Sequence, residues 1–120
     1  RLMRRHWTGP LTLILPVRDR RLARAGLSKN GAVGVRVSSH AVPRTISRAL
    51  GRPIVATSAN RSGAPAAHAL AEFVLQFRGK KLPDAFLDAG RLPLRSPSTV
   101  ALIIDGNIHI VRSGRVVPRV

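Results

Sequence analysis

The chain has 120 residues, and its 21 Lys and Arg against 5 Asp and Glu give a formal charge of +16. A hydrophobic content of 44% excludes a disordered basic tail, and the absence of cysteine excludes disulfides and thiolate metal sites. The length predicts a single domain over residues 1–120. The sequence has no apolar run of membrane-spanning length and does not begin like a secretory signal, so we expect a cytoplasmic protein without membrane contact.

The first part of the chain predicts two strands between short helical or charged segments. We expect, in order, the end of a helix over residues 1–7, a strand over Leu11–Leu15, a charged loop or short helix over 18–24, and a strand over Ala32–Val37. Alternation in the second strand places its valines on one face and Gly34 and Arg36 on the other.

The second part of the chain alternates helices and strands and ends in a hairpin. We expect a helix over 43–50, a short buried strand over Pro53–Ala56, a polar loop over 57–65, a helix over 69–78, a weak strand over Ala85–Ala89, and strands over 99–104 and 108–112. Asp105-Gly106 between two apolar runs is a strong hairpin signal. This order predicts an α/β fold with a twisted, mixed, open sheet and flanking helices.

Several common kinds of active site are disfavoured by the sequence. The five carboxylates are scattered, the four histidines lack metal-ligand spacing, and neither standard nucleotide-binding glycine motif is present. We therefore expect no catalytic side chain and no protein-bound metal. The arginine-rich charge favours polyanionic partners, although codon bias in a GC-rich genome explains the excess equally well. With 3% aromatic residues, a sheet that stacks RNA bases is not expected.

A polar loop follows the predicted strand Pro53–Ala56, at the sheet edge where open α/β sheets bind ligands. Ser58 supplies a hydroxyl for anionic oxygens, Asn60 supplies a donor and an acceptor for adenine or ribose, and Gly63 allows a close backbone approach. An ordinary Asn/Ser/Gly turn is an equally good interpretation of these residues.

Two further positions are candidates for binding anions. Arg36 is a cation within a Val/Gly strand, where its planar guanidinium suits a carboxylate, or where it is simply a solvated edge residue. Counted outward from the predicted hairpin turn, Ser98 and Arg112 fall near the same open end. That pair predicts a phosphate site.

Taken together, these segments resemble a known family. From near Arg1 to near Arg115, their order and spacing are similar to the C-terminal half of the YrdC-type threonylcarbamoyl-AMP synthase domain. The segments are Trp7-Thr-Gly-Pro-Leu-Thr-Leu-Ile14, Val33-Gly-Val-Arg-Val-Ser-Ser-His40, Pro53-Ile-Val-Ala-Thr-Ser-Ala-Asn-Arg-Ser-Gly63, Ser98-Thr-Val100 and Val111-Arg-Ser-Gly114. The S-A-N-x-S-G part is the most specific of them.

The resemblance implies a twisted α/β fold like that of dihydroxybutanone-phosphate synthase. It implies a nucleotidyltransferase that condenses L-threonine, bicarbonate and ATP to threonylcarbamoyl-AMP and pyrophosphate, for modification of a tRNA adenosine, with Mg²⁺ carried by the ATP phosphates. It also implies binding of double-stranded RNA or tRNA. Carried over residue by residue, it assigns Arg36, Ser58 and Ser98 to threonine, and Thr12, Asn60 and Arg112 to ATP.

The sequence also departs from the family pattern. Thr8 and Ser38 stand where proline is usual, and Ala66 and His68 stand where hydroxyl residues are common. The family's N-terminal P-T-D-T-x-Y-G-L strand and K-x-R block are not in this sequence. We therefore expect a partial domain that is inactive alone and needs a partner chain to supply the other half. A non-catalytic YrdC-like remnant that binds RNA is the alternative.

Overall fold

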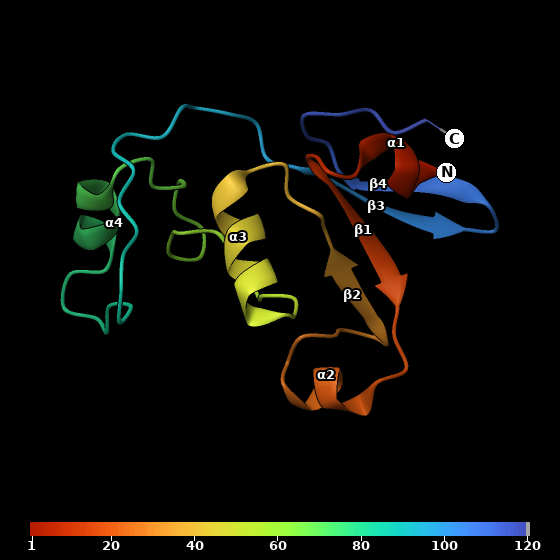
Figure 1. Ribbon diagram of the computed structural model, residues 1–120, viewed down its shortest axis with the longest axis horizontal. Coiled ribbons are helices and arrows are strands. Elements are labelled where there is room, and N and C mark those ends of the chain that lie inside the picture. Colours follow the sequence, from red (N-terminus) through yellow and green to blue (C-terminus); the bar gives the residue numbers. More distant parts are fainter. Residues whose placement is uncertain (120) are drawn as a thin grey trace. The chain divides into compact units, whose positions relative to one another are not determined.

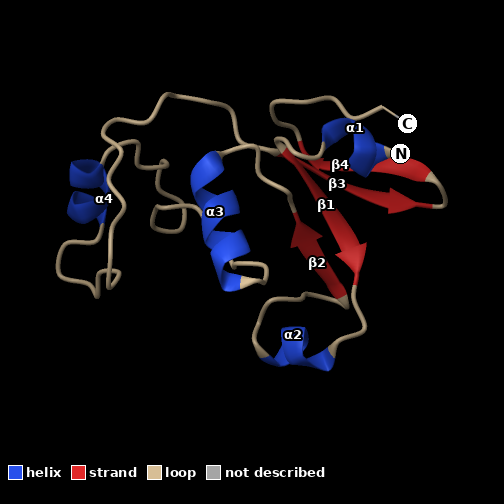
Figure 2. Ribbon diagram, viewed as in Figure 1, coloured by secondary structure: helices blue, strands red, loops and turns tan. Residues whose placement is uncertain are grey.

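The computed structural model describes residues 1–119, which form two compact units. The first unit comprises Arg1–Val55 and the chain from Ser96 onward, and the second comprises Ala56–Arg95. All four strands belong to the first unit (Figures 1 and 2). Within residues 1–119, no helix combines the length and the apolar composition that a membrane crossing requires.

The first unit is built on a mixed sheet with the strand order β2-β1-β3-β4. The strands are β1 (Leu11–Pro16), β2 (Ala32–Val35), β3 (Thr99–Ile104) and β4 (Asn107–Arg112). The central strands β1 and β3 run parallel, while β2 and β4 are antiparallel to their neighbours. The predicted α/β class with a mixed, open sheet is confirmed.

One face of this sheet carries the core. Leu11, Leu13 and Ala101 are almost completely buried on it, together with the side chain of Thr99. Helix α1 (Leu2–His6) contributes Leu2 to the same cluster, and Trp7 packs against it. The intervening residues of β1 and β3 are only half-buried, so the opposite face is the more open one.

The hairpin forms as predicted. Asp105 and Gly106 both have positive φ, at 48° and 79°, which is the conformation of a tight two-residue turn between twisted antiparallel strands. Glycine is needed because its lack of a Cβ removes the steric cost of that conformation.

The predicted helices over 43–50 and 69–78 are confirmed with shifted bounds, as α3 (Ala41–Leu50) and α4 (Leu70–Gln76). Helix α3 begins two residues early because the His40 side chain accepts a hydrogen bond from the Val42 amide and so caps the first turn. The charged segment 18–24 contains a short helix, α2 (Arg20–Arg24), which Asp19 caps.

Two predicted strands are wrong. Residues Pro53–Ala56 and Ala85–Ala89 are exposed and join no strand of the described chain. Ile54 and Val55 have high strand propensity, but that propensity measures how well a side chain fits a half-buried sheet surface, and here these residues have no neighbouring strand. The strand expected over Ala32–Val37 ends earlier, at Val35, whose pairing with Leu13 is the last of the β1–β2 ladder.

Candidate functional site

Three of the predicted site residues meet at one end of the sheet. The hydroxyls of Thr12 and Ser98 lie 3.1 Å apart and share a hydrogen bond. The Arg112 guanidinium donates to the backbone oxygen of Ser98 at 2.9 and 3.3 Å and to its hydroxyl at 3.3 Å. Two hydroxyls and a cation thus form one cluster on the first unit.

The parallel pairing of β1 with β3 brings Thr12 and Ser98 together. Leu11 pairs with Thr99 and Thr12 with Val100, and the Thr99 amide donates to the Pro10 oxygen at 2.9 Å. Because Thr99 is buried on the core face, Ser98 before it faces the open side, as Thr12 does. The cluster therefore lies on the half-buried face of the sheet.

A β-bulge explains how Arg112 reaches this face. The β3–β4 ladder pairs Ala101 with Ile110 and then Val100 with Arg112, so that Val111 has no partner. In a regular hairpin Arg112 would stand opposite Thr99 and face the core. The extra residue returns Arg112 to the open face, which is the role that bulges often have beside functional sites.

Gly114 brings the chain after β4 against the start of β3. A Cβ built on Gly114 would lie 2.4 Å from the Pro97 oxygen, 2.5 Å from the Thr99 nitrogen and 2.6 Å from the Ser98 carbonyl carbon. The Arg115 amide donates to that same Pro97 oxygen at 3.1 Å. Only glycine allows this approach, so Gly114 holds the backbone on which the Ser98 side chain stands.

Arg36 lies just beyond the end of β2 and is exposed. The chain nevertheless continues alongside β1, since the Gly9 amide donates to the Val37 oxygen at 2.9 Å. Two residues earlier, Gly34 pairs with Ile14, and a Cβ built on Gly34 would lie 3.4 Å from Thr12 Cγ2, so β2 passes beside Thr12 just before Arg36. The register thus places Arg36 at the same end of the sheet as the Thr12, Ser98 and Arg112 cluster.

This end of the sheet suits anions. The ion pairs found among residues 1–119 are Arg21 with Asp19 and Arg91 with Glu72, and neither involves Arg112. Hydroxyl donors beside a guanidinium that is not neutralised by a carboxylate stabilise phosphate or carboxylate groups.

The other two predicted site residues belong to the second unit. Ser58 is exposed, and Asn60 is half-buried in a loop that it organises itself. Its Nδ2 donates to the backbone oxygens of Arg61 and Ala64 at 2.9 and 2.8 Å, while its Oδ1 is buried without a hydrogen-bond partner in the structure. The amide donors of Asn60 are therefore used in the loop, and its free capacity is as an acceptor.

The end of this loop is fixed by a carboxylate on α4. Glu72 accepts a hydrogen bond from the His68 backbone amide at 2.8 Å and forms an ion pair with Arg91 at 2.7 Å. These bonds, from the His68 amide first and then from Arg91, hold the pKa of Glu72 below its ordinary value of 4.5.

We expect the His68 amide to lose protection from hydrogen exchange on acidification. A carboxyl whose pKa is lowered in the folded state stabilises that state above its unfolded pKa, and this stabilisation is lost as the pH falls through the folded pKa. Exchange of the His68 amide, relative to its intrinsic rate, should therefore quicken as the pH is lowered below the ordinary carboxyl pKa of 4.5. Glu72→Gln should remove most of this dependence. An unchanged protection factor on this acidification would contradict the role of Glu72.

Sequence reasoning missed the residues that shape this site without touching a ligand. The bulge at Val111 had one local signal that was not used, since the consecutive apolar residues Ile110 and Val111 break the alternation of the run 108–111. Gly114 was noticed only as part of a motif, and a glycine directly after a strand was the one available signal. Gln76 of α4, whose side chain bonds the Arg61 amide and the Pro65 oxygen of the polar loop, gave no signal, because a polar residue on a short amphipathic helix is ordinarily solvent-exposed.

Comparison with known proteins gives one family. The model of the Sua5/YciO/YrdC family, described as "Telomere recombination", matches residues 1–114. Among the curated proteins, a threonylcarbamoyl-AMP synthase of Marinobacter nauticus is 33% identical over 102 residues, which cover 85% of this chain and 53% of that protein. The chain thus spans about half the length of this relative.

Solved structures give the same result. The crystal structure of Sua5 from P. abyssi complexed with L-threonine matches with a TM-score of 0.78 and 31% identity, over 94% of this chain and 32% of that one. A doubly substituted variant of the P. abyssi protein matches with a TM-score of 0.77 and 32% identity, over 95% of this chain and 34% of that one. The sequence blocks, the mixed sheet and these matches agree, and the chain belongs to the Sua5/YciO/YrdC family.

Proposed function

We propose that this chain carries part of the site of a threonylcarbamoyl-AMP synthase, which condenses L-threonine, bicarbonate and ATP with release of pyrophosphate. The observation that carries the proposal is the cluster of Thr12, Ser98 and Arg112 on the open face of the sheet. The curated relative that bears this name and the P. abyssi protein solved with L-threonine support it.

The chemistry of the proposed reaction matches the composition of the site. Carboxylates and phosphates must be held close together and their charge neutralised, which requires positioning and electrostatic stabilisation more than a protein nucleophile. Arg112 and Arg36 supply positive charge, and Thr12 and Ser98 supply hydroxyl donors. In the proposal Mg²⁺ enters with the ATP phosphates.

The proposal assigns separate roles to the two arginines. Arg36 pairs with the threonine carboxylate, together with the hydroxyl of Ser98, and Ser58 of the polar loop also serves threonine. Arg112 and Thr12 serve the ATP phosphates. Asn60 serves the nucleotide from the polar loop, whose backbone it holds through its Nδ2 bonds to Arg61 and Ala64.

A calorimetric comparison of the two arginines tests these roles. The test uses this chain joined to the remaining part of the domain, which the longer relatives carry. In that protein, Arg36→Ala should weaken threonine binding about ten- to a hundredfold, since a charge-assisted bond contributes about 1.5–3 kcal/mol. ATP binding should change much less. Arg112→Ala should show the opposite pattern. Arg36→Lys should rescue threonine binding only in part, because lysine lacks the planar fork.

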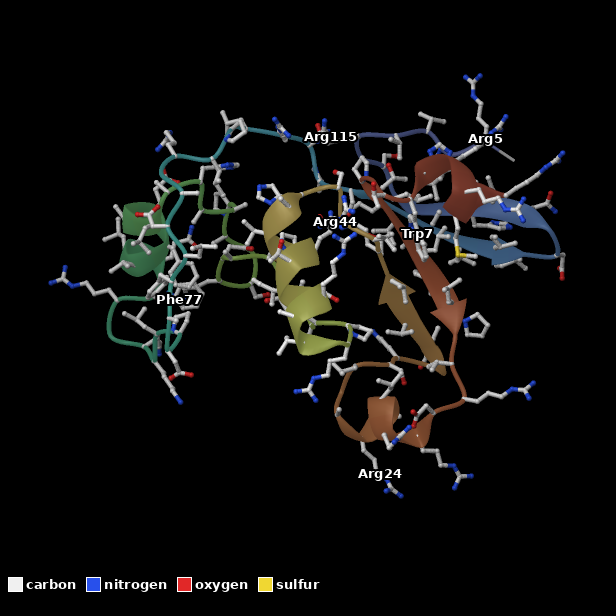
Figure 3. All side chains as sticks on the ribbon, in the orientation of Figure 1. Arg5, Trp7, Arg24, Arg44, Phe77 and Arg115 are labelled. Atoms are coloured by element: carbon white, nitrogen blue, oxygen red, sulfur yellow. The ribbon has the colours of Figure 1, made fainter. Side chains whose placement is uncertain are left out.

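Two controls make this comparison decisive. Circular dichroism of each variant must show a folded protein, and Arg24→Ala on α2, remote from the cluster and pointing away from the chain in Figure 3, should leave both affinities unchanged. Unchanged threonine affinity in a folded Arg36→Ala protein would make Arg36 a solvated edge residue and end its assignment.

We also propose that the chain binds double-stranded RNA or tRNA through its distributed positive charge. The support is the formal charge of +16, with exposed arginines such as Arg18, Arg20 and Arg24 around α2. Binding of a duplex RNA should weaken steeply with salt, because each neutralised phosphate releases counterions. Titrations at several salt concentrations measure this slope. A flat response, or no binding at low salt, would leave the arginine excess to codon bias.

We further propose that a partner segment covers apolar surface of the first unit, whether it lies on a longer polypeptide or on a separate chain. The support is the amphipathic helix α3, whose Val42, Ile46 and Leu50 follow one another at four-residue spacing and are 36%, 44% and 50% exposed. Such a stripe is ordinarily buried against another element, and contiguous exposed apolar surface marks an interaction site.

A further inference from the structure

Gln76, the last residue of α4, holds both ends of the tight turn in the second unit's polar loop. Its Oε1 accepts a hydrogen bond from the Arg61 backbone amide at 3.1 Å. Its Nε2 donates to the Pro65 backbone oxygen at 3.0 Å. One side-chain amide therefore fixes the residue that opens the turn and the residue that follows it.

The turn itself has the geometry that such fixing requires. The Ala64 amide donates to the Arg61 oxygen at 2.9 Å, and Gly63 has a φ of +80°, which is the arrangement of a type II turn with glycine in its third position. Asn60 binds the oxygens of Arg61 and Ala64 from within the loop. The loop is thus held by Asn60 on one side and by Gln76 on the other.

Helix α4 is in turn held firmly enough to serve as a support. Glu72 lies one helical turn before Gln76, so both polar side chains face the loop, and Glu72 binds the His68 amide. On another side of the helix, Phe73 stacks on Phe77, which is labelled in Figure 3, with ring centroids 4.5 Å apart. Phe73 also meets Phe86 edge-on, with ring centroids 5.6 Å apart. These contacts limit rotation of the helix, and with it the position of the Gln76 amide.

We propose that Gln76 is a positioning residue, which sets the conformation of the S-A-N-x-S-G loop and thereby its ability to bind ATP. This inference rests on the proposed function, since the loop carries Ser58 and Asn60. Both ends of the Gln76 side-chain amide are engaged in the loop, Oε1 by the Arg61 amide and Nε2 by the Pro65 oxygen. Its effect on binding therefore passes through the backbone of residues 61–65.

Two substitutions separate the two hydrogen bonds. Gln76→Met removes both and keeps the side-chain length, so exchange of the Arg61 amide should become about tenfold faster. Gln76→Glu keeps an acceptor for the Arg61 amide but loses the donor to Pro65 and sets a carboxylate against its carbonyl oxygen. Arg61 should then stay protected, while the carbonyl carbon resonance of Pro65 shifts. A side chain with only a space-filling role would not divide its effects in this way.

The measurement is nuclear magnetic resonance of this chain joined to the remaining part of the domain, as in the calorimetric test, with and without added ATP. The matched control is Leu75→Ala, since Leu75 neighbours Gln76 on α4, is 70% exposed and is replaced by a good helix former. In the wild type and in Leu75→Ala, ATP should shift the amide resonances of residues 58–65. In Gln76→Met these shifts should fall several-fold, and Gln76→Glu should recover part of them.

The outcomes distinguish this inference from the proposed function. Unchanged Arg61 exchange in Gln76→Met, or equal ATP shifts in Gln76→Met and the wild type, would overturn the positioning role. If ATP shifts neither the loop nor the Arg112 side chain of the wild type, while Gln76→Met still speeds Arg61 exchange, the proposed ATP site has failed. The role of Gln76 in ATP binding is then overturned together with the ATP site, and the two Gln76 hydrogen bonds are only a structural feature of the loop.

Discussion

Gly114→Ala is expected to destabilise the first unit by about 3 kcal/mol, at the upper end of what overpacking costs. The added methyl would stand 2.4 to 2.6 Å from three backbone atoms of Pro97, Ser98 and Thr99, and backbone cannot turn aside as the end of a side chain can. The chain after β4 must then move away from β3. That movement breaks the bond from the Arg115 amide to Pro97 and shifts Ser98 away from Thr12 and Arg112.

Urea denaturation of the wild type and the variant measures this loss. The matched control is Gly106→Ala in the β3–β4 turn, where no atom lies within 4 Å of the added Cβ and only the positive φ of 79° opposes it. That control should cost about 1 kcal/mol, the strain of the left-handed conformation for a residue with a Cβ. If both variants lose the same free energy of unfolding, Gly114 does not lie in tight contact with residues 97–99 in solution.

The second large effect is expected in catalysis. The 120-residue chain by itself should form threonylcarbamoyl-AMP far more slowly than the roughly 1 s⁻¹ typical of the slower enzymes. The chain covers only 53% of its curated relative, and the stripe of Val42, Ile46 and Leu50 on α3 lies open. Both observations support the proposal that part of the site and of its support comes from residues outside this sequence.

Release of pyrophosphate in the presence of threonine, bicarbonate, ATP and Mg²⁺ measures this activity. Addition of the complementary part of the domain from a relative should raise the rate by orders of magnitude. Val42→Asp on α3 should reduce that gain, because it places a charge on the surface that the added part would cover. Turnover near 1 s⁻¹ by the chain alone would refute both the expected inactivity and the need for a partner segment.

The sequence predicted the elements whose signals are local. The hairpin was found because Asp105-Gly106 is favoured in only a few turn types, and α4 was found because Leu70, Phe73, Val74 and Phe77 repeat with helical spacing. Ser98 and Arg112 were brought together by counting from that turn, and the structure has them in contact.

The errors arose where long-range pairing decides the structure. Residues 53–56 have the side chains of a buried strand, but strand formation depends on a neighbour that the local sequence does not specify. The bulge at Val111 was also missed, although Ile110 and Val111 interrupt the alternation, because the pairing of β4 with β3 decides which residue is left without a partner. The count from the turn placed Arg112 at the correct end but could not tell which face it occupies.

The hydrogen bond between Thr12 and Ser98 joins residues that are 86 positions apart in the chain. The pairing of β1 with β3 therefore closes a long loop, and such non-local contacts form late and slow the folding of a small domain. The whole second unit lies inside this loop. Because the entropy of closing a loop grows only logarithmically with its length, doubling the loop costs about 0.6 kcal/mol. Insertions within 79–95, beyond the S-A-N-x-S-G loop and α4, thus cost little loop-closure entropy, and β1 and β3 can stay paired when this stretch is lengthened.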